Sequence, residues 1–145
     1  MRESPGVVRI LVVDDYEPFR RFVCAILEAR PELQVIGEAS DGLQAVQKAE
    51  ELQPDLILLD IGMPTLNGIE AAHRISRLVP AAKILFISQD SDAEVIAAAL
   101  SNGAKGYVLK LDAVRELLLA VESVLQGQRF ISAGITELRA ITQWE

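Results

Sequence analysis

Short runs of aliphatic residues alternate along this chain with longer segments in which apolar residues recur at helical spacing. The short runs cover residues 8–13, 33–37, 56–59, 83–87 and 106–109. Continuous aliphatic runs of this length, bounded by turn residues, predict strands that are buried on both faces, as in parallel sheets. Five strands that alternate with five helices imply βαβ units, right-handed crossovers and helices on both faces of the sheet.

The helical segments begin and end at typical capping and stop residues. They are expected to run from about Glu17 to Arg30, from Asp41-Gly42 to Gln53-Pro54, from Asn67-Gly68 to Pro80, from Ser91 to Asn102-Gly103 and from Asp112 to Gly127. Ser91 and Glu94 have the spacing of a capping box, in which each side chain binds the free amide of the other residue. Asp112 is a typical N-cap residue. With no internal repeat and no interdomain linker before Gly127, one domain is expected.

Polar residues follow four of the predicted strands directly. These residues are the pair Asp14-Asp15, then Asp60, Ser88 and Lys110. In an open α/β sheet, ligands bind at the carboxyl ends of the strands. One such residue alone is most often a solvated strand end or a turn. Several on one edge of the sheet indicate a functional site.

The residue types at this edge suit a metal ion and a phosphoryl group. Two adjacent carboxylates and a third on a neighbouring strand form an oxygen-rich pocket of the kind that Mg²⁺ prefers. An ammonium and a hydroxyl can stabilise a tetrahedral anion that forms on one of the carboxylates. Because aspartyl phosphate is a known covalent intermediate, the residues suggest a carboxylate that accepts a phosphoryl group.

Composition argues against several classes of protein. Half of the 145 residues are hydrophobic, yet no apolar run approaches the ~20 residues needed to cross a membrane. The N-terminus lacks the apolar segment of a secretory signal, and the single Cys24 cannot form an internal disulfide, so a cytoplasmic protein is expected. A net charge of −7 and a pI near 4.8 argue against nucleic acid binding by this chain.

Taken together, these motifs resemble the receiver domain of two-component response regulators. The resemblance rests on Asp14-Asp15, residues 60–64 (DIGMP), Ser88 and residues 103–110 (GAKGYVLK). The resemblance covers roughly residues 7–127. The amino-acid sequences of residues 67–72 and 106–110 are most similar to those of the NarL/FixJ-like subclass. The resemblance implies a flavodoxin-like fold with a five-stranded parallel sheet in the order 2-1-3-4-5. Residues 128–145 are then a tail, or the start of a linker to an output domain absent from this chain.

The same resemblance assigns the acidic residues. Asp60 is expected to accept a phosphoryl group from a phosphohistidine on a partner histidine kinase. Asp15, Asp60 and the backbone carbonyl of Gly62 are expected to bind Mg²⁺ or Mn²⁺ directly. Asp14 is expected to act through a coordinated water molecule. The domain accepts the group on its own side chain and loses it slowly, so it is expected not to be a turnover enzyme.

It also assigns the switch residues. Lys110 is expected to pair with Asp60 and then with the phosphoryl oxygens, and the Ser88 hydroxyl to hydrogen-bond the phosphoryl group. Tyr107 matches the position whose aromatic ring changes rotamer as Ser88 moves. This chain departs from the family after Lys110, where Leu111 replaces the usual proline with its cis bond.

Three other functions stay open at this point. A Mg²⁺-dependent phosphatase with an aspartyl nucleophile would use similar residues. A receiver fold that no longer accepts phosphate would be a pure interaction module. In the NarL/FixJ-like subclass a receiver usually precedes a helix-turn-helix DNA-binding domain, so the resemblance implies control of transcription as the output. A stand-alone receiver that regulates a protein partner is the alternative.

A helical wheel gives an expectation for self-association. In the fourth helix it places Val95, Ala98 and Ala99 inward and Ile96 and Leu100 toward the flank. In the last helix the expected core stripe is Val114, Leu117, Leu118, Val121 and Leu125, with Leu119 on the opposite side. An exposed leucine on an element that shifts with phosphorylation suggests a weak, phosphorylation-dependent homodimer.

Overall fold

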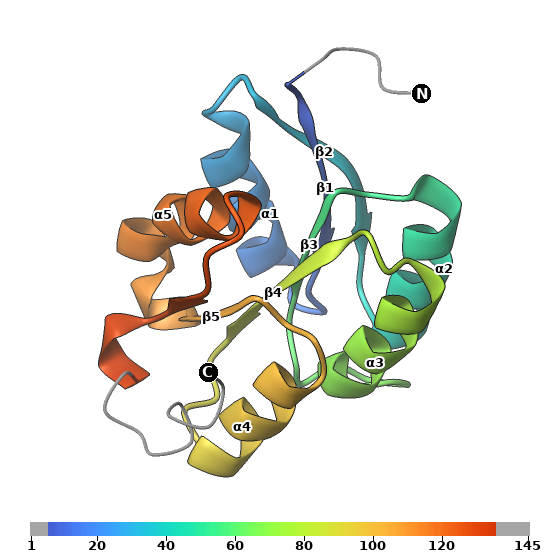
Figure 1. Ribbon diagram of the computed structural model, residues 1–145, viewed down its shortest axis with the longest axis vertical. Coiled ribbons are helices and arrows are strands. Elements are labelled where there is room, and N and C mark those ends of the chain that lie inside the picture. Colours follow the sequence, from blue (N-terminus) through green and yellow to red (C-terminus); the bar gives the residue numbers. More distant parts are fainter. Residues whose placement is uncertain (1–5, 136–145) are drawn as a thin grey trace.

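A parallel sheet of six strands runs through the centre of the computed structural model, which describes residues 6–135 (Figure 1). The strands are β1 (Val8–Val13), β2 (Leu33–Ala39), β3 (Leu56–Leu59), β4 (Lys83–Ser88), β5 (Gly106–Leu109) and β6 (Phe130–Ile131). Their order in the sheet is β2-β1-β3-β4-β5-β6, and all neighbouring strands pair parallel. The predicted flavodoxin-like α/β fold is confirmed, but the predicted number of five strands is wrong.

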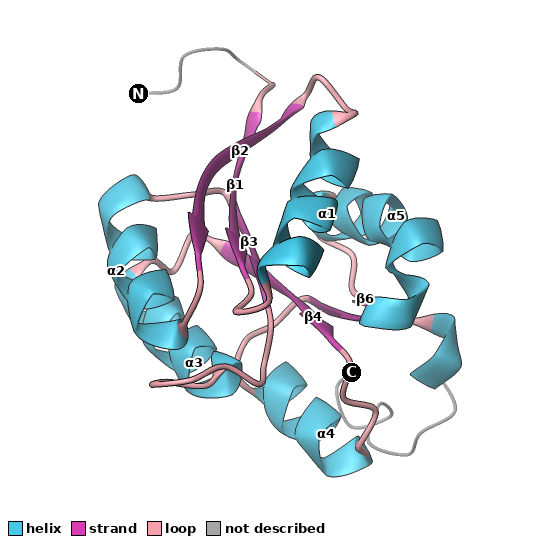
Figure 2. Cartoon of the chain, turned by 180° about the vertical axis from the view of Figure 1, so that it is seen from behind, coloured by secondary structure: helices cyan, strands magenta, loops and turns pink. Residues whose placement is uncertain are grey.

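Helices cover both faces of the sheet. They are α1 (Glu17–Glu28), α2 (Gly42–Leu52), α3 (Gly68–Leu78), α4 (Ala93–Ser101) and α5 (Ala113–Leu125). Helices α1 and α5 lie on one face, and α2, α3 and α4 lie on the other (Figures 1 and 2). None of these helices is both long enough and apolar enough to span a bilayer.

The strand sequences explain the two cores. Successive side chains of a strand point to opposite faces, so Ile10 and Val12 of β1 join the core under α1 and α5. Leu11 and Val13 join the core under the other three helices. All four residues of β3 are buried, as the continuous aliphatic run predicts for a central parallel strand.

Side-chain caps begin three of the helices. The carboxylate of Asp41 accepts a hydrogen bond from the Gln44 amide, and the side chain of Asn67 accepts one from the Glu70 amide. Helix α4 is capped by Asp92, so the predicted capping box at Ser91 is wrong.

The position predicted for the start of the last helix is confirmed, but its capping bond is not made. Asp112 ends a short 3₁₀ helix, η1 (Lys110–Asp112), that leads into α5. Its carboxylate accepts a hydrogen bond from the Arg115 guanidinium at 2.7 Å. The amides of the first turn of α5 donate no hydrogen bond to this side chain.

The sixth strand lies beyond residue 127, where the receiver part was predicted to end. After α5 the chain turns back and β6 pairs with β5, with the Phe130 amide donating to the Lys105 carbonyl at 3.2 Å. Ser132 and Ile135, which follow β6, are buried. Residues 136–145 of the predicted tail lie outside the described residues.

The predicted inner faces of α4 and α5 need correction. In α4 the buried residues are Ile96, Ala99 and Leu100, and Val95 and Ala98 are only partly buried. In α5 the buried residues are Ala113, Leu117, Ala120, Val121 and Val124, and Leu118 and Leu125 are partly buried. Val114 was placed in the core stripe but is 75% exposed, whereas Leu119 is 57% exposed, as predicted.

The loop from β3 to α3 brings the first residue of α3 against the acidic strand end. A Cβ atom on Gly68 would lie 1.9 Å from the backbone oxygen of Asp60. The Gly68 amide also donates to the Ile61 carbonyl at 2.7 Å, which closes the loop. Only a residue without a side chain permits this approach, so Gly68 fixes the backbone that carries Asp60.

We predict that Gly68→Ala destabilises the fold by about 3 kcal/mol or more, because backbone atoms cannot move aside as a flexible side chain does. Gly62→Ala in the same loop is the matched control, since a Cβ atom there meets nothing within 4 Å. Urea unfolding of both variants measures the difference. Equal stabilities would contradict this account of the loop.

Candidate functional site

Three carboxylates meet at the carboxyl edge of the sheet. Asp14 and Asp15 follow β1, and Asp60 follows the neighbouring β3. One oxygen from each carboxylate lies within 4.8 Å of the others. Asp14 and Asp60 are buried, whereas Asp15 is exposed. The topology thus gathers the three acidic residues predicted from the sequence.

The Lys110 ammonium is the counter-ion of the two buried carboxylates. Its Nζ atom lies 2.8 Å from Oδ2 of Asp14 and 3.4 Å from Oδ2 of Asp60. The same atom lies 4.6 Å from the centre of the Phe19 ring, in a cation–π contact. Lys110 is therefore held between α1 and two strand ends.

Burial and like charge perturb the acidic residues. Burial, together with the charge of Asp14, raises the pKa of Asp60 from 3.8 to about 6, although Lys110 acts in the opposite direction. Burial alone would lower the pKa of Lys110. The hydrogen bond to Asp14 and the charges of both carboxylates outweigh that effect, so the pKa of Lys110 is raised. Lys110 stays an ammonium, while Asp60 carries a charge that the site does not fully neutralise.

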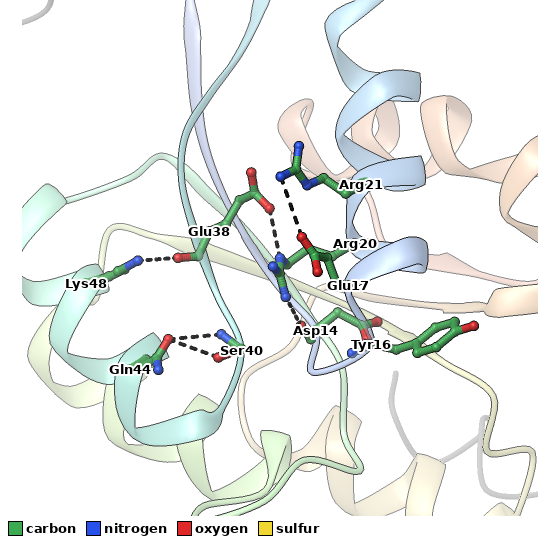
Figure 3. Close-up of polar contacts among 9 residues, drawn as sticks. All are labelled: Asp14, Tyr16, Glu17, Arg20, Arg21, Glu38, Ser40, Gln44 and Lys48. Atoms are coloured by element: carbon green, nitrogen blue, oxygen red, sulfur yellow. Dashed lines mark hydrogen bonds and ion pairs between the residues drawn. The ribbon is translucent and has the colours of Figure 1, made fainter.

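Backbone amides and an arginine hold the carboxylates in place. Oδ1 of Asp60 accepts from the Ile61 amide, and Oδ1 of Asp14 accepts from the Tyr16 amide. Figure 3 shows the side chain of Arg20, from α1, bridging Glu38 of β2 and Asp14 after β1: Nη1 donates to the Asp14 carbonyl at 2.9 Å and Nε donates to Glu38 at 2.8 Å. Arg20 thereby ties the backbone of Asp14 to the neighbouring strand.

The carboxylates open into a pocket of about 520 Å³, large enough for a small phosphorylated group. Its lining includes Asp15, Asp60, Gly62, Ser88 and Lys110. Five of the residues predicted for the site thus line one pocket. Asp14 adjoins it through its ion pair with Lys110.

Tyr107 is not among the residues that line this pocket and is buried in the core. Its hydroxyl donates to the Asp90 carbonyl at 2.7 Å, and burial raises its pKa to about 12, so it remains a donor. The Asp90 amide in turn donates to Oγ of Ser88 at 3.1 Å. Tyr107 and Ser88 are therefore linked through the start of the β4–α4 loop.

The residues present fit a divalent cation. Three carboxylates beside one ammonium leave about two negative charges to be neutralised near neutral pH. Mg²⁺ binds through one or two carboxylates and retains several waters, which an open pocket admits. Asp15 and Asp60 would hold the ion, together with the Gly62 carbonyl at the rim of the same pocket.

Sequence reasoning missed two residues that support the site, Phe19 and Arg20. Neither residue was assigned a role in the site from the sequence. One signal was available, since the first turn of a helix that follows β1 must lie at the carboxyl edge of the sheet. The peptide bond between Lys110 and Leu111, where the family commonly has a cis proline, is trans.

Comparisons with known proteins agree with this geometry. The family model for the response regulator receiver domain matches residues 10–122. The chain is 38% identical over 122 residues to the transcriptional regulatory protein LiaR of Bacillus subtilis, covering 84% of this chain and 58% of that protein. It is 36% identical over 131 residues to the nitrate/nitrite response regulator protein NarL of Escherichia coli K12, covering 90% of this chain and 61% of that protein.

A solved structure gives the same result. The crystal structure of a LuxR-family two-component response regulator from Aurantimonas sp. SI85-9A1 matches with a TM-score of 0.88 and 33% identity, over 96% of this chain and 99% of that one. This chain belongs to the response regulator receiver domain family, and its relatives are regulators of the NarL and LuxR type. It spans between 55% and 63% of the length of the first curated relatives it matches.

The raised pKa of Asp60 predicts a pH-dependent stability. The folded chain binds the Asp60 proton more tightly than the unfolded chain, so ionisation costs stability as pH rises from about 4 to about 6, and the full cost remains above that. Asp60→Asn should therefore stabilise the metal-free protein by about 1–3 kcal/mol at pH 7. Lys110 keeps Asp14 as its partner in this variant.

Urea unfolding between pH 3.5 and 8 measures this effect. The gain in stability from Asp60→Asn should vanish below about pH 4, where the wild-type carboxyl is protonated in both the folded and the unfolded state. Mg²⁺ should shrink the gain at pH 7 because it neutralises the wild-type carboxylate. A variant less stable than wild type at pH 7 would show that Lys110 fully compensates Asp60.

Proposed function

We propose that this chain is the phosphoryl-accepting switch of a two-component system, with Asp60 as the acceptor and a histidine kinase as the donor. The observation that carries the proposal is the position of Asp60: a buried carboxylate that faces Lys110, borders two further carboxylates and opens into a pocket. Membership of the receiver family supports the same assignment. The compartment in which we place this reaction is the cytoplasm.

The proposed transfer is an in-line displacement. A carboxylate oxygen of Asp60 forms a bond to phosphorus as the P–N bond of the donor phosphohistidine breaks, and the electron pair returns to the imidazole nitrogen. Lys110 stays protonated and pairs with the transferred phosphoryl oxygens, and the Ser88 hydroxyl donates to one of them. Mg²⁺, held by Asp15, Asp60 and the Gly62 carbonyl with Asp14 acting through a water, would supply charge neutralisation at the phosphoryl oxygens.

The proposed signal is a shift between two arrangements of the β4–α4 loop and β5. Ser88 and Tyr107 each hold Asp90 through its backbone. When Ser88 turns toward the phosphoryl group, the amide of Asp90 loses its acceptor, and Tyr107 is free to change rotamer. The new charge of about −1.5 to −2 on Asp60 biases this equilibrium.

The proposed output is control of transcription through a DNA-binding domain that is not in this chain. The named relatives are transcriptional regulators, and this chain matches only part of their length. With its net charge of −7, the chain itself is not expected to bind DNA. A stand-alone receiver that regulates a protein partner is the alternative output.

The direct test is incubation with Mg²⁺ and acetyl phosphate followed by intact mass. Wild type should gain one phosphoryl group, and Asp60→Asn should gain none. Asp41→Asn is the matched control, since it lies outside the carboxylate cluster and asparagine caps α2 as well as aspartate does. Asp15→Asn should weaken Mg²⁺ binding and labelling together.

Three outcomes would contradict the proposal. Labelling of Asp60→Asn at wild-type stoichiometry would show that another residue is the acceptor. Sustained release of phosphate from external esters would favour the phosphatase. No mass change in wild type would favour a pure interaction module.

We also propose a weak homodimer that uses α5 and strengthens on phosphorylation. Three apolar side chains are exposed on η1 and α5: Leu111 (82%), Val114 (75%) and Leu119 (57%). Sedimentation with beryllofluoride and Mg²⁺ should show dimers for wild type and monomers for Leu119→Glu. Leu78→Glu, at an exposed leucine of α3, is the control and should dimerise as wild type does. A wild-type monomer at high concentration under both conditions would rule out the dimer.

A further inference from the structure

The segment that follows α5 is bound to the strand that carries Tyr107 and Lys110. We name residues 130–135 the C-terminal strap; it comprises β6 and the 3₁₀ helix η2 (Ala133–Ile135). Figure 2 shows β6 beside α5, and the strand order places it at the edge of the sheet. The Ser132 amide donates to the Tyr107 carbonyl at 2.9 Å. Ile135 is buried in the same core as Tyr107 and Leu109.

The Ser132 hydroxyl makes the central contacts of the strap. It accepts a hydrogen bond from the Leu109 amide at 2.9 Å and donates one to Oε1 of Glu116 at 2.6 Å. The other carboxylate oxygen of Glu116 accepts from the Ala133 amide at 3.2 Å. Ser132 is fully buried, so water cannot replace these partners.

These contacts explain why a serine hydroxyl stands at this point of the sheet. The Ser132 carbonyl accepts from the Ile135 amide inside the strap, so backbone pairing with β5 ends here. The side-chain oxygen of Ser132 then binds the last amide of β5, that of Leu109. Leu109 is the residue directly before Lys110.

We propose that Ser132 and Glu116 are positioning residues that hold the Lys110 end of β5, and that phosphorylation of Asp60 loosens the C-terminal strap. This inference rests on the proposed function of Asp60. It describes how phosphorylation of Asp60 would affect the strap, residues 130–135. The strap and the acceptor pocket are connected through β5. The strap binds Tyr107 and Leu109 of this strand, and Lys110, which follows the strand directly, lines the acceptor pocket.

The position of Lys110 explains why phosphorylation is expected to loosen the strap and not to tighten it. Its ammonium lies closer to Asp14, at 2.8 Å, than to Asp60, at 3.4 Å. A doubly charged group on Asp60 draws the ammonium toward it. Because Lys110 follows Leu109 directly, that movement pulls the Leu109 amide away from the Ser132 hydroxyl. Hydrogen bonds weaken steeply as they lengthen and bend, so the strap is released.

Residue-resolved hydrogen exchange of wild type, with and without beryllofluoride and Mg²⁺, tests the loosening. The amides of Leu109, Ser132 and Ala133 should exchange about fivefold faster or more with the phosphate mimic, which is the lower end of typical coupling between sites. The Gln44 amide is the internal control, since it too is bound by a side-chain oxygen. Its exchange should not change.

The reverse effect is required by linkage, because two coupled sites affect each other equally. Ser132→Ala should therefore bind beryllofluoride about fivefold more tightly, since its strap is already loosened. Glu116→Gln should shift the affinity in the same direction by less, because one acceptor oxygen remains. Ser76→Ala on α3, where the hydroxyl makes one 3.5 Å bond to the Asn102 carbonyl, is the matched control and should bind as wild type does.

The outcomes separate this inference from the proposed function. If acetyl phosphate labels Asp60 normally but the strap amides do not respond to beryllofluoride, the inference is wrong and the acceptor role stands. Weaker beryllofluoride binding by Ser132→Ala would also overturn it, because the strap would then support the phosphorylated state. A wild-type protein that neither labels nor binds beryllofluoride would overturn the proposed function itself. The wild-type exchange measurement needs no variant, so a Ser132→Ala protein that fails to fold does not prevent the test.

Discussion

One ammonium, that of Lys110, faces two buried carboxylates, and the rest of the site depends on this imbalance of charge. Asp14 takes the closer contact with Lys110, so burial and the charge of Asp14 raise the pKa of Asp60. A buried charge without a full partner is costly, and the site can lower that cost by binding a cation. Under the proposed function, a phosphoryl group on Asp60 would add negative charge on the side of Lys110 that is less well paired. Both acidic strand ends are held in place, that of β3 by the close approach of Gly68 and that of β1 by Arg20.

The sequence predicts most of the fold because its strands are continuous aliphatic runs with clear turn signals between them. It does not predict β6, since two residues, Phe130–Ile131, are too few to form a recognisable strand pattern. The predicted inner face of α4 was correct only at Ala99. That helix is apolar at every position except Glu94 and Ser101, so a helical wheel cannot distinguish its faces. Val114, which lies in the first turn of α5 directly after η1, was also misplaced.

The site was more predictable than the surface around it. Carboxyl ends of parallel strands share one edge, so the positions of Asp14, Asp60 and Lys110 in the sequence suffice to bring them together. The supporting contacts depend on geometry that spacing does not contain. Phe19 reaches Lys110 only because of how α1 lies against the sheet. Ser132 reaches β5 only because the chain turns back after α5.

The most direct test of the electrostatic account is the pKa of the Asp60 carboxyl, measured by carbon-detected NMR titration with and without Mg²⁺. The account predicts a pKa of about 6 in metal-free protein and a value well below that when Mg²⁺ is bound. In Asp15→Asn the metal-free value should stay raised, because burial and Asp14 remain, while the response to Mg²⁺ weakens. A pKa near the ordinary 3.8 in metal-free protein, with no response to Mg²⁺, would contradict the central claim.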